Sequence, residues 1–442
     1  MRNSNTPPNR NLTHRLWCLL ILFTVVAPSH GEQLTPITFV NARVFDGENV
    51  IPKASVRIEK GKIVKVNEGL VPVADSKSVN CEGMTLMPGL IDCHTHVFFR
   101  PQLVQAVQFG VTTELDMMSA PRMTQPLRDE QSDGDVEDRA DFFSAGCPVT
   151  VEGGHGTQFG MPVPTLGKAE DADAFVQARV DEGADYLKII YEDGEAIGMS
   201  MPTVTPEMVN AAVKAAHARK KIAVSHLSSL ASAEHLLDAK INGFVHLFAD
   251  DVVPDAFVKR AVQSKLFVVP TTTVISGVCG VPVGELHTKD ESLAAFLTAM
   301  DKSFVARRFP KREMPTTVDK LKANIRKLHE AGVPILAGTD APNPGTTHGA
   351  SMHVELELLV DAGLSTKDAL AAATLLPAKH FGLDDRGRIA VGLNADLLLV
   401  KGNPIEDITA TRRIEGVWKS GVKVDREELR ERVARQLADE DG

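Results

Sequence analysis

Several features are scarce in this sequence of 442 residues, and their scarcity excludes whole classes of protein. Lysine and arginine number 48 against 58 aspartates and glutamates, and the net charge of −10 does not indicate the basic face that nucleic-acid binding requires. No polybasic run suggests attachment to a membrane surface. The five cysteines contain no C-x-x-C pair, so no disulfide framework is predicted. A chain of this length can bury a core of its own without such bonds.

The main apolar run lies near the N-terminus. Residues 16–27 are largely apolar, follow Arg10 and Arg15, and precede small residues at 29–31. The run is shorter than the roughly 20 apolar residues of a transmembrane helix. We therefore predict that residues 1–31 are a signal peptide and that the product is secreted or periplasmic, without stable membrane association after cleavage. An uncleaved membrane anchor is the alternative.

Both ends of the remaining chain alternate apolar and polar residues and contain turn signals such as Asp46-Gly47. We predict that residues 32–86 and 386–426 pair into one composite β-sandwich domain. Residues 87–385 alternate apolar strands with helical stretches, which favours βα units and a parallel sheet. Residues 427–442 are predicted to be a C-terminal tail.

The central region predicts an α/β fold with eight strands, enough to close a (β/α)8 barrel, also called a TIM barrel. The predicted strands are residues 90–97, 111–116, 147–152, 186–191, 222–226, 243–247, 266–272 and 334–339. Helical stretches such as 206–219 and 231–239 lie between them. A longer charged segment, residues 285–330, separates the last two strands and is a candidate lid.

Side chains that can bind metals follow or end several of these strands. Residues 94 and 96 are both histidine, and the period of two in a strand places them on one face. By itself such a pair can be two ordinary polar residues. Lys188 lies inside an apolar run, where an unpaired charge is costly. Six candidates lie at the C-terminal ends of strands, where barrels of this kind carry their active sites: His94, His96, Lys188, His226, His246 and Asp340.

The order and spacing of these motifs resemble the amidohydrolase superfamily, metal-dependent hydrolases built on a (β/α)8 barrel. The resemblance is carried by P-G-L-I-D-C-H-T-H at 88–96, the lysine strand, the two histidine strands, and G-T-D-A at 338–341. Within the superfamily the chain is similar to the imidazolonepropionase-like and Xaa-Pro dipeptidase-like branch, which includes ochratoxin-type amidases. The resemblance also implies a satellite domain built from both termini.

The resemblance implies two divalent metal ions. One would be held by His94, His96 and Asp340, the other by His226 and His246, and Lys188 would bridge them as N6-carboxylysine. A hydroxide bridging the ions would attack the substrate, and Asp340 would take up the proton and pass it to the leaving amine. Nitrogen and oxygen ligands favour zinc, with manganese or cobalt as substitutes.

Three further residues are candidates for catalysis or substrate binding. His155 follows the third strand and Tyr191 lies just beyond Lys188, and in the related dipeptidases the matching positions contact the substrate carbonyl or carboxylate. A structural role is an equal alternative for each. His348, in the loop after strand eight, is a candidate lining residue, although an ordinary surface histidine is the competing interpretation. No arginine stands in a motif that would clamp a carboxylate.

We therefore predict an exported binuclear amidohydrolase that cleaves an amide bond of a dipeptide or an N-acyl amino acid. One alternative is a mononuclear cyclic-amide hydrolase of the imidazolonepropionase type, or a lactonase, on the same scaffold. Another is a binding protein without catalysis. The expected partner is a small-molecule amide or peptide substrate. Whether the protein forms a homo-oligomer is left open by the sequence.

Overall fold

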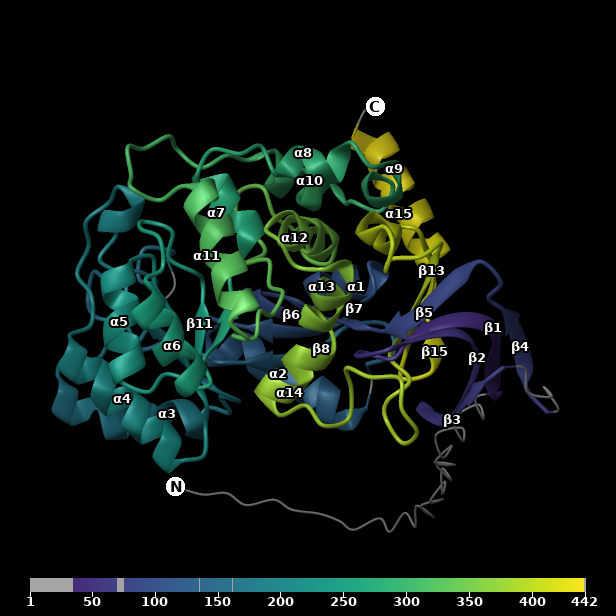
Figure 1. The fold of residues 1–442 in the computed structure, drawn as a ribbon, viewed down its shortest axis with the longest axis horizontal. Coiled ribbons are helices and arrows are strands. Elements are labelled where there is room, and N and C mark those ends of the chain that lie inside the picture. Colours follow the sequence, from purple (N-terminus) through teal and green to yellow (C-terminus); the bar gives the residue numbers. More distant parts are fainter. Residues whose placement is uncertain (1–34, 70–74, 135, 161, 441–442) are drawn as a thin grey trace, which may run out of the picture. The chain divides into compact units, whose positions relative to one another are not determined.

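Strands of two kinds organise this protein: a mixed sheet built from both ends of the chain, and parallel strands between them (Figure 1). The computed structural model describes residues 35–69, 75–134, 136–160 and 162–440. The predicted signal peptide, residues 1–31, lies outside the described residues. The alternation of parallel strands and helices gives an α/β fold, as the sequence predicts.

The mixed sheet joins the two ends of the chain. Its strands follow the order β15-β14-β13-β5-β1-β2-β3, with β4 paired to β1, and β5 lies antiparallel to β13. All eight strands belong to one sheet. The predicted sandwich, which needs two packed layers, therefore stays a prediction. The strands are β1 (Ile37–Phe45), β2 (Val50–Glu59), β3 (Lys62–Glu68), β4 (Lys77–Asn80), β5 (Met84–Pro88), β13 (Leu397–Lys401), β14 (Ile414–Lys419) and β15 (Val422–Lys423).

The parallel strands pair with their neighbours in sequence. One sheet has the order β6-β7-β8 and the other β12-β11-β10-β9. Single parallel bridges continue the pairing, from Val149 to Ile189, from Val268 to Ile335 and from Thr95 to Ala341. The carboxyl ends of the strands therefore share one edge. The strands are β6 (Leu90–Thr95), β7 (Val111–Asp116), β8 (Asp141–Ser144), β9 (Leu187–Ile190), β10 (Ala223–His226), β11 (Gly243–Val245) and β12 (Phe267–Val269).

Two predicted strands are wrong in position or extent. The third strand is β8, which ends before the predicted residues 147–152, and only Val149 of that segment forms a bridge. Gly146 has a φ of 65° and turns the chain, and Pro148 has no N–H to donate to a ladder. The predicted eighth strand, residues 334–339, forms one bridge through Ile335. Pro334 precedes that residue and likewise lacks a donor.

Helices cover the parallel strands. Thr205 and Ser229 cap α4 and α5 by accepting hydrogen bonds from backbone N–H groups, and both helices match predicted helical stretches. No helix in the described part of the chain combines the length and apolarity needed to cross a bilayer. The helices are α1 (Arg100–Gln108), α2 (Pro121–Asp133), α3 (Ala172–Asp181), α4 (Pro206–Ala218), α5 (Leu230–Asp238), α6 (Asp255–Gln263), α7 (Thr272–Val278), α8 (Gly284–Thr288), α9 (Glu291–Ala294), α10 (Ala299–Ala306), α11 (Val318–Glu330), α12 (Ala350–Asp361), α13 (Thr366–Ala372), α14 (Leu375–Phe381) and α15 (Arg426–Glu440).

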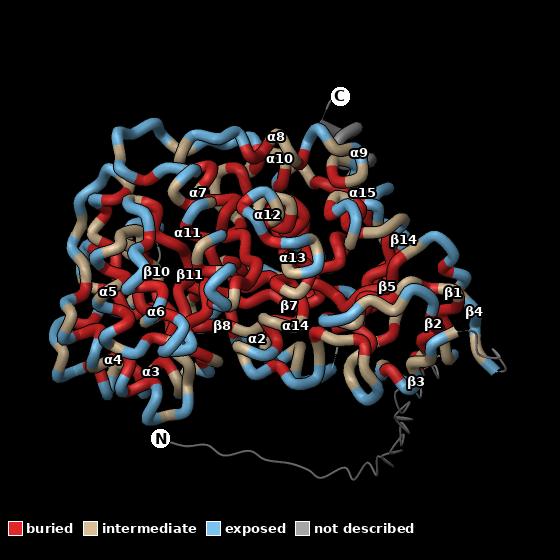
Figure 2. The backbone as a smooth tube through the Cα atoms, in the orientation of Figure 1, coloured by how far each residue is buried: buried red, intermediate tan, exposed pale blue. Residues whose placement is uncertain are grey.

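Burial is greatest along the parallel strands, and exposed residues follow the outer helices and loops (Figure 2). Within the candidate lid at 285–330, α11 buries Leu321 and Leu328 in the main core, so this last part of the segment belongs to the fold itself. Residues 427–440 of the predicted tail belong to α15, whose Leu429 packs in a cluster with Phe109 and Phe296.

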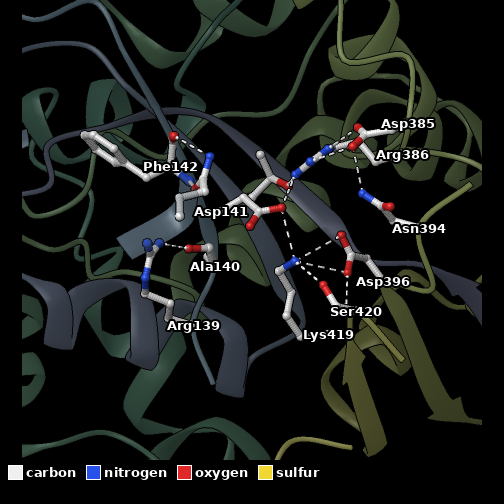
Figure 3. Close-up of polar contacts among 12 residues, drawn as sticks. Arg139, Ala140, Asp141, Phe142, Asp385, Arg386, Asn394, Asp396, Lys419 and Ser420 are labelled. Carbon is white, nitrogen blue, oxygen red and sulfur yellow. Dashed lines mark hydrogen bonds and ion pairs between the residues drawn. The ribbon is translucent and has the colours of Figure 1, made fainter. Parts of the chain in front are cut away.

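A buried cluster of charges connects the mixed sheet to the first residue of β8 (Figure 3). Lys419 on β14 is 1% exposed, and its Nζ lies 3.1 Å from the carboxylate of Asp141 and 3.2 Å from that of Asp396. Arg386 pairs with Asp141 and Asp385. Burial alone would lower the pKa of Lys419, but the carboxylates of Asp396 and Asp141 raise it. The lysine is therefore charged when the protein is folded.

Replacing Lys419 with methionine should destabilise the protein by about 3–5 kcal/mol, because the Asp396 carboxylate would stay buried without a cation. The matched control is Lys401→Met, on the neighbouring strand β13. That lysine side chain is 64% exposed and its pair with Glu415 is 3.0 Å long, so we expect a loss of about 0–1 kcal/mol. Urea unfolding of both variants measures the difference. Equal midpoints would show that the buried cluster contributes no more than a surface pair.

Candidate active site

A single cavity of about 460 Å³ lies at the carboxyl ends of the parallel strands, and all six predicted metal-site residues line it. The local sequence explains their convergence. The histidines lie at or just beyond the last residues of buried strands, Lys188 lies inside β9, and Asp340 follows the segment 334–339. Neighbouring parallel strands bring these positions to one edge. The six are His94, His96, Lys188, His226, His246 and Asp340.

Four histidine rings form a continuous row in this cavity. The ring centroids of His94 and His246 are 4.6 Å apart, those of His226 and His246 are 4.3 Å apart, and His96 lies 5.5 Å from His94. Burial lowers the pKa of His226 to about 3 and the pKa values of His94 and His246 well below their usual range. These three rings are therefore neutral at physiological pH, and a neutral imidazole has a lone pair for a metal ion.

Asp340 lies against three of the histidines. One carboxylate oxygen is 2.9 Å from Nε2 of His96 and 3.4 Å from Nε2 of His94, and the other is 3.8 Å from Nε2 of His246. Candidate ligand atoms of His94, His246 and Asp340 all lie within 4.8 Å of one another. This grouping differs from the predicted division, in which His246 pairs with His226 on the other ion.

The orientation of His246 is set by its neighbour Thr271. The Thr271 hydroxyl lies 2.6 Å from Nδ1 of His246 and donates to the Pro270 carbonyl at 2.8 Å. Because the carbonyl can only accept, the hydroxyl proton is used there and Nδ1 of His246 must donate. Nε2 of His246 is left with its lone pair toward Asp340. The adjacent N–H groups of Thr272 and Thr273 donate to the buried carboxylate of Glu355, which anchors this turn.

Lys188 on β9 is 3% exposed and lines the same cavity. Burial lowers its pKa to about 7, although the carboxylates of Asp340 and Asp116 act in the opposite direction. A substantial fraction of the side chain is therefore an uncharged amine near neutral pH, and an uncharged amine is nucleophilic. This is the form that carboxylation requires.

His155 lies beside the row of histidines, 4.6 Å from His226 between ring centroids. The Gln158 side chain fixes its tautomer. Oε1 of Gln158 accepts from the N–H of Gly156 at 2.7 Å, so Nε2 of Gln158 must be the atom that lies 3.0 Å from Nδ1 of His155. An amide nitrogen only donates, so Nδ1 accepts. Burial lowers the pKa of His155 to about 3, so the ring is neutral and its proton is on Nε2. His155 is thus a neutral hydrogen-bond donor at the cavity.

Two of the predicted substrate-binding residues do not line the cavity. Tyr191 is buried in the main core, and its hydroxyl lies 3.0 Å from Nδ1 of His235. Tyr191 is three residues beyond Lys188, and an odd separation along a strand puts the two side chains on opposite faces. His348 is 2% exposed and its Nδ1 is 2.9 Å from the carboxylate of Glu114. Neither the predicted cavity position nor a surface loop position holds for His348.

Glu192 is an acidic residue of the cavity that we did not predict. It lines the cavity, is 1% exposed, and has one oxygen 3.3 Å from Nε2 of His226. The signal was present in the sequence, because Glu192 is an even number of residues from both Lys188 and Ile190, which also line the cavity. Burial raises the pKa of this carboxyl group.

The side chains present fit a divalent cation. One carboxylate oxygen of Asp340 is buried without a hydrogen-bond partner, beside Nε2 of His94 and Nε2 of His96. Burying such atoms is costly unless they are paired, and a metal ion supplies the partner. Neutral imidazoles and a carboxylate are ligands of zinc and similar ions. The parallel α/β fold and this site define a metal-dependent hydrolase.

The comparisons with known proteins agree with the fold and the site. The family model described as "Amidohydrolase family" matches residues 85–424. The imidazolonepropionase of Anaeromyxobacter sp. (strain K) is 25% identical over 79% of this chain and 84% of its own length. The ochratoxinase of Aspergillus niger is 22% identical over 76% of this chain and 75% of its own length. A crystal structure of a Xaa-Pro dipeptidase with bound methionine superposes with a TM-score of 0.72 at 23% identity, covering 88% of this chain and all of that one.

The chain belongs to the amidohydrolase family, because the family model covers more than half of its residues. It is a hydrolase that acts on carbon–nitrogen bonds, as the family and its homologues support. The dipeptidase structure is below 25% identity and therefore supports the fold alone.

Proposed function

We propose that this chain is a binuclear metal-dependent amidase that cleaves the amide bond of a dipeptide or an N-acyl amino acid. The observation that carries the proposal is the convergence of four histidines, Lys188 and Asp340 on one cavity, where burial lowers the pKa of the lysine to about 7. A carboxylated lysine would bridge two cations, which zinc, manganese or cobalt could provide. We also propose that the parallel strands and their bridging segments form a closed (β/α)8 barrel, and that the strands from both ends form a sandwich.

Two divalent ions, when bound, would lower the pKa of a water molecule and polarise the substrate carbonyl. His94, His96 and Asp340 would hold one ion and His226 and His246 the other, with Lys188 between them. Because Asp340 contacts His94, His96 and His246, its carboxylate is placed to accept a proton from the attacking water and return it to the leaving amine. Nε2–H of His155 would donate to the oxygen of the scissile carbonyl as negative charge develops there.

A mononuclear enzyme is the second candidate, and one observation favours it. Within the described residues, the group of ligand atoms close enough for one ion contains His94, His246 and Asp340 and omits His226. A single ion at this group would suit a cyclic-amide hydrolase or a lactonase. Lys188 would then have no second ion to bridge.

Metal analysis separates the two candidates. Protein saturated with zinc or manganese and freed of excess metal should contain two ions per chain by elemental analysis, because the six residues divide into two sets that share Lys188. Removal of the ions by a chelator should abolish hydrolysis, and restoring the metal should recover it. A content that stays at one ion under metal excess would contradict the binuclear proposal.

The substrate class is tested on the same metal-loaded protein. The panel consists of Xaa-Pro dipeptides, N-acyl amino acids, lactones and cyclic ureides. Turnover confined to lactones or ureides would contradict the amidase proposal and leave the metal site intact.

A further inference from the structure

One buried carboxylate in the cavity has an oxygen without a partner. Oε1 of Glu192 accepts hydrogen bonds from the N–H of Gly194 at 2.6 Å and from the hydroxyl of Ser228 at 2.8 Å. Oε2 is buried, has no hydrogen-bond partner and lies 3.3 Å from Nε2 of His226. Oε1 is therefore anchored by the loop, and Oε2 is held in place with nothing to bind.

Neither the neighbouring histidine nor the candidate ion group satisfies Oε2. Nε2 of His226, when it serves as a metal ligand, offers a lone pair and no proton. Glu192 also does not belong to the described group of ligand atoms around His94, His246 and Asp340. A buried carboxylate oxygen is costly unless a cation or a hydrogen-bond donor faces it. No described side chain supplies that partner, so it comes from an ion held by His226 and His246 or from a molecule in the cavity.

The remaining cavity wall restricts what that molecule can be. Among its described lining residues Lys188 is the one cationic side chain, and no arginine is present. A cationic group on a substrate would therefore meet no competing positive side chain once Lys188 is carboxylated. The other walls are mainly apolar and include Phe98, Met117, Phe159, Ile197, Phe304 and Phe309.

We propose that Glu192 binds a protonated amino group of the substrate, and that the preferred substrates are apolar aminoacyl amides with a free α-amine. This inference rests on the proposed amide hydrolysis and narrows it. The ammonium pairs with Oε2 of Glu192, the apolar side chain packs against the aromatic and aliphatic wall, and the carbonyl faces Asp340 and His155. N-acyl amino acids, which have no free amine, are then poorer substrates than dipeptides and other aminoacyl amides.

Paired substrates test this directly. Leucine p-nitroanilide and N-acetyl-leucine p-nitroanilide differ in the charge on the amine. We expect wild-type kcat/KM to favour the free amine by about tenfold to hundredfold, the value of one hydrogen bond to a charged group. Glu192→Gln should bring the ratio close to one. Glu195→Gln, the same change at an exposed carboxylate on the same loop, should leave the ratio unchanged. A ratio near one in the wild-type protein would overturn the inference.

A binding experiment separates this inference from the proposed reaction. Leucine hydroxamate and N-acetyl-leucine hydroxamate, titrated by calorimetry into metal-loaded protein, should show the same Glu192-dependent preference without any turnover. If no amide is hydrolysed but the preference is present, the amine-binding role of Glu192 stands and the proposed hydrolysis fails. If amides are hydrolysed and Glu192→Gln weakens both hydroxamates equally or lowers the metal content, the inference is overturned and hydrolysis stands.

Discussion

Replacing Asp340 with asparagine should lower kcat/KM by about 10²–10⁴-fold, the usual contribution of a positioned general base. The carboxylate lies 2.9 Å from Nε2 of His96 and is the acidic group that contacts three of the cavity histidines. An amide oxygen can still contact a metal ion, but it cannot take up a proton at neutral pH. The rate of the chemical step should therefore fall more than substrate binding.

The measurement is the steady-state rate at saturating metal, together with the metal content of the variant. Asp250→Asn is the control, because Asp250 accepts one hydrogen bond from the N–H of Leu230 and an asparagine oxygen can accept the same bond. We expect near wild-type kcat/KM for this control. Full metal content and wild-type kcat in the Asp340→Asn variant would show that this carboxylate does not transfer the proton.

Replacing Lys188 with alanine should reduce activity by more than about 100-fold, because even outer partners of metal ligands contribute roughly 10–100-fold. Lys188 is buried in the cavity and is the residue that would join the two sets of ligands. The metal content should fall from two ions toward one. Formate or propionate should restore part of the activity, since a small carboxylate can occupy the space of the missing bridge.

The control for this experiment is Lys259→Ala, which removes an exposed lysine from α6 and should change neither metal content nor rate. The measurements are elemental analysis and hydrolysis rates with and without the carboxylate. Full activity of Lys188→Ala without any added carboxylate would show that the lysine is no bridge, and the mononuclear candidate would then be preferred.

Local sequence patterns were enough to predict much of the catalytic cavity. The period of two along a strand predicted that His94 and His96 share a face, and apolar runs ending in His226 and His246 predicted buried strands with polar ends. The same period, applied to β9, would have predicted Glu192 and excluded Tyr191, since Lys188, Ile190 and Glu192 share one face. The family resemblance had instead favoured Tyr191, whose matching position contacts substrate in related dipeptidases.

Strand ends were less predictable than strand faces. β8 lies at Asp141–Ser144 because Gly146 and Pro148 stop regular pairing after it, although the apolar residues around Val149 continue. The pattern of apolar residues reports burial, and burial alone does not distinguish a paired strand from a segment with a single bridge. Turn conformation and missing N–H donors decided the difference.

By itself, the sequence determined that the six candidate metal ligands lie at one cavity and that the protein is a metal-dependent hydrolase, because these depend on strand periodicity and on local motifs. The tertiary structure alone decided which side chains touch. It paired His348 with Glu114 across 234 residues, placed Lys419 between Asp141 and Asp396, and grouped His246 with His94 and Asp340. These contacts depend on distances of a few ångströms between segments that are far apart in the chain, and no local pattern specifies such distances.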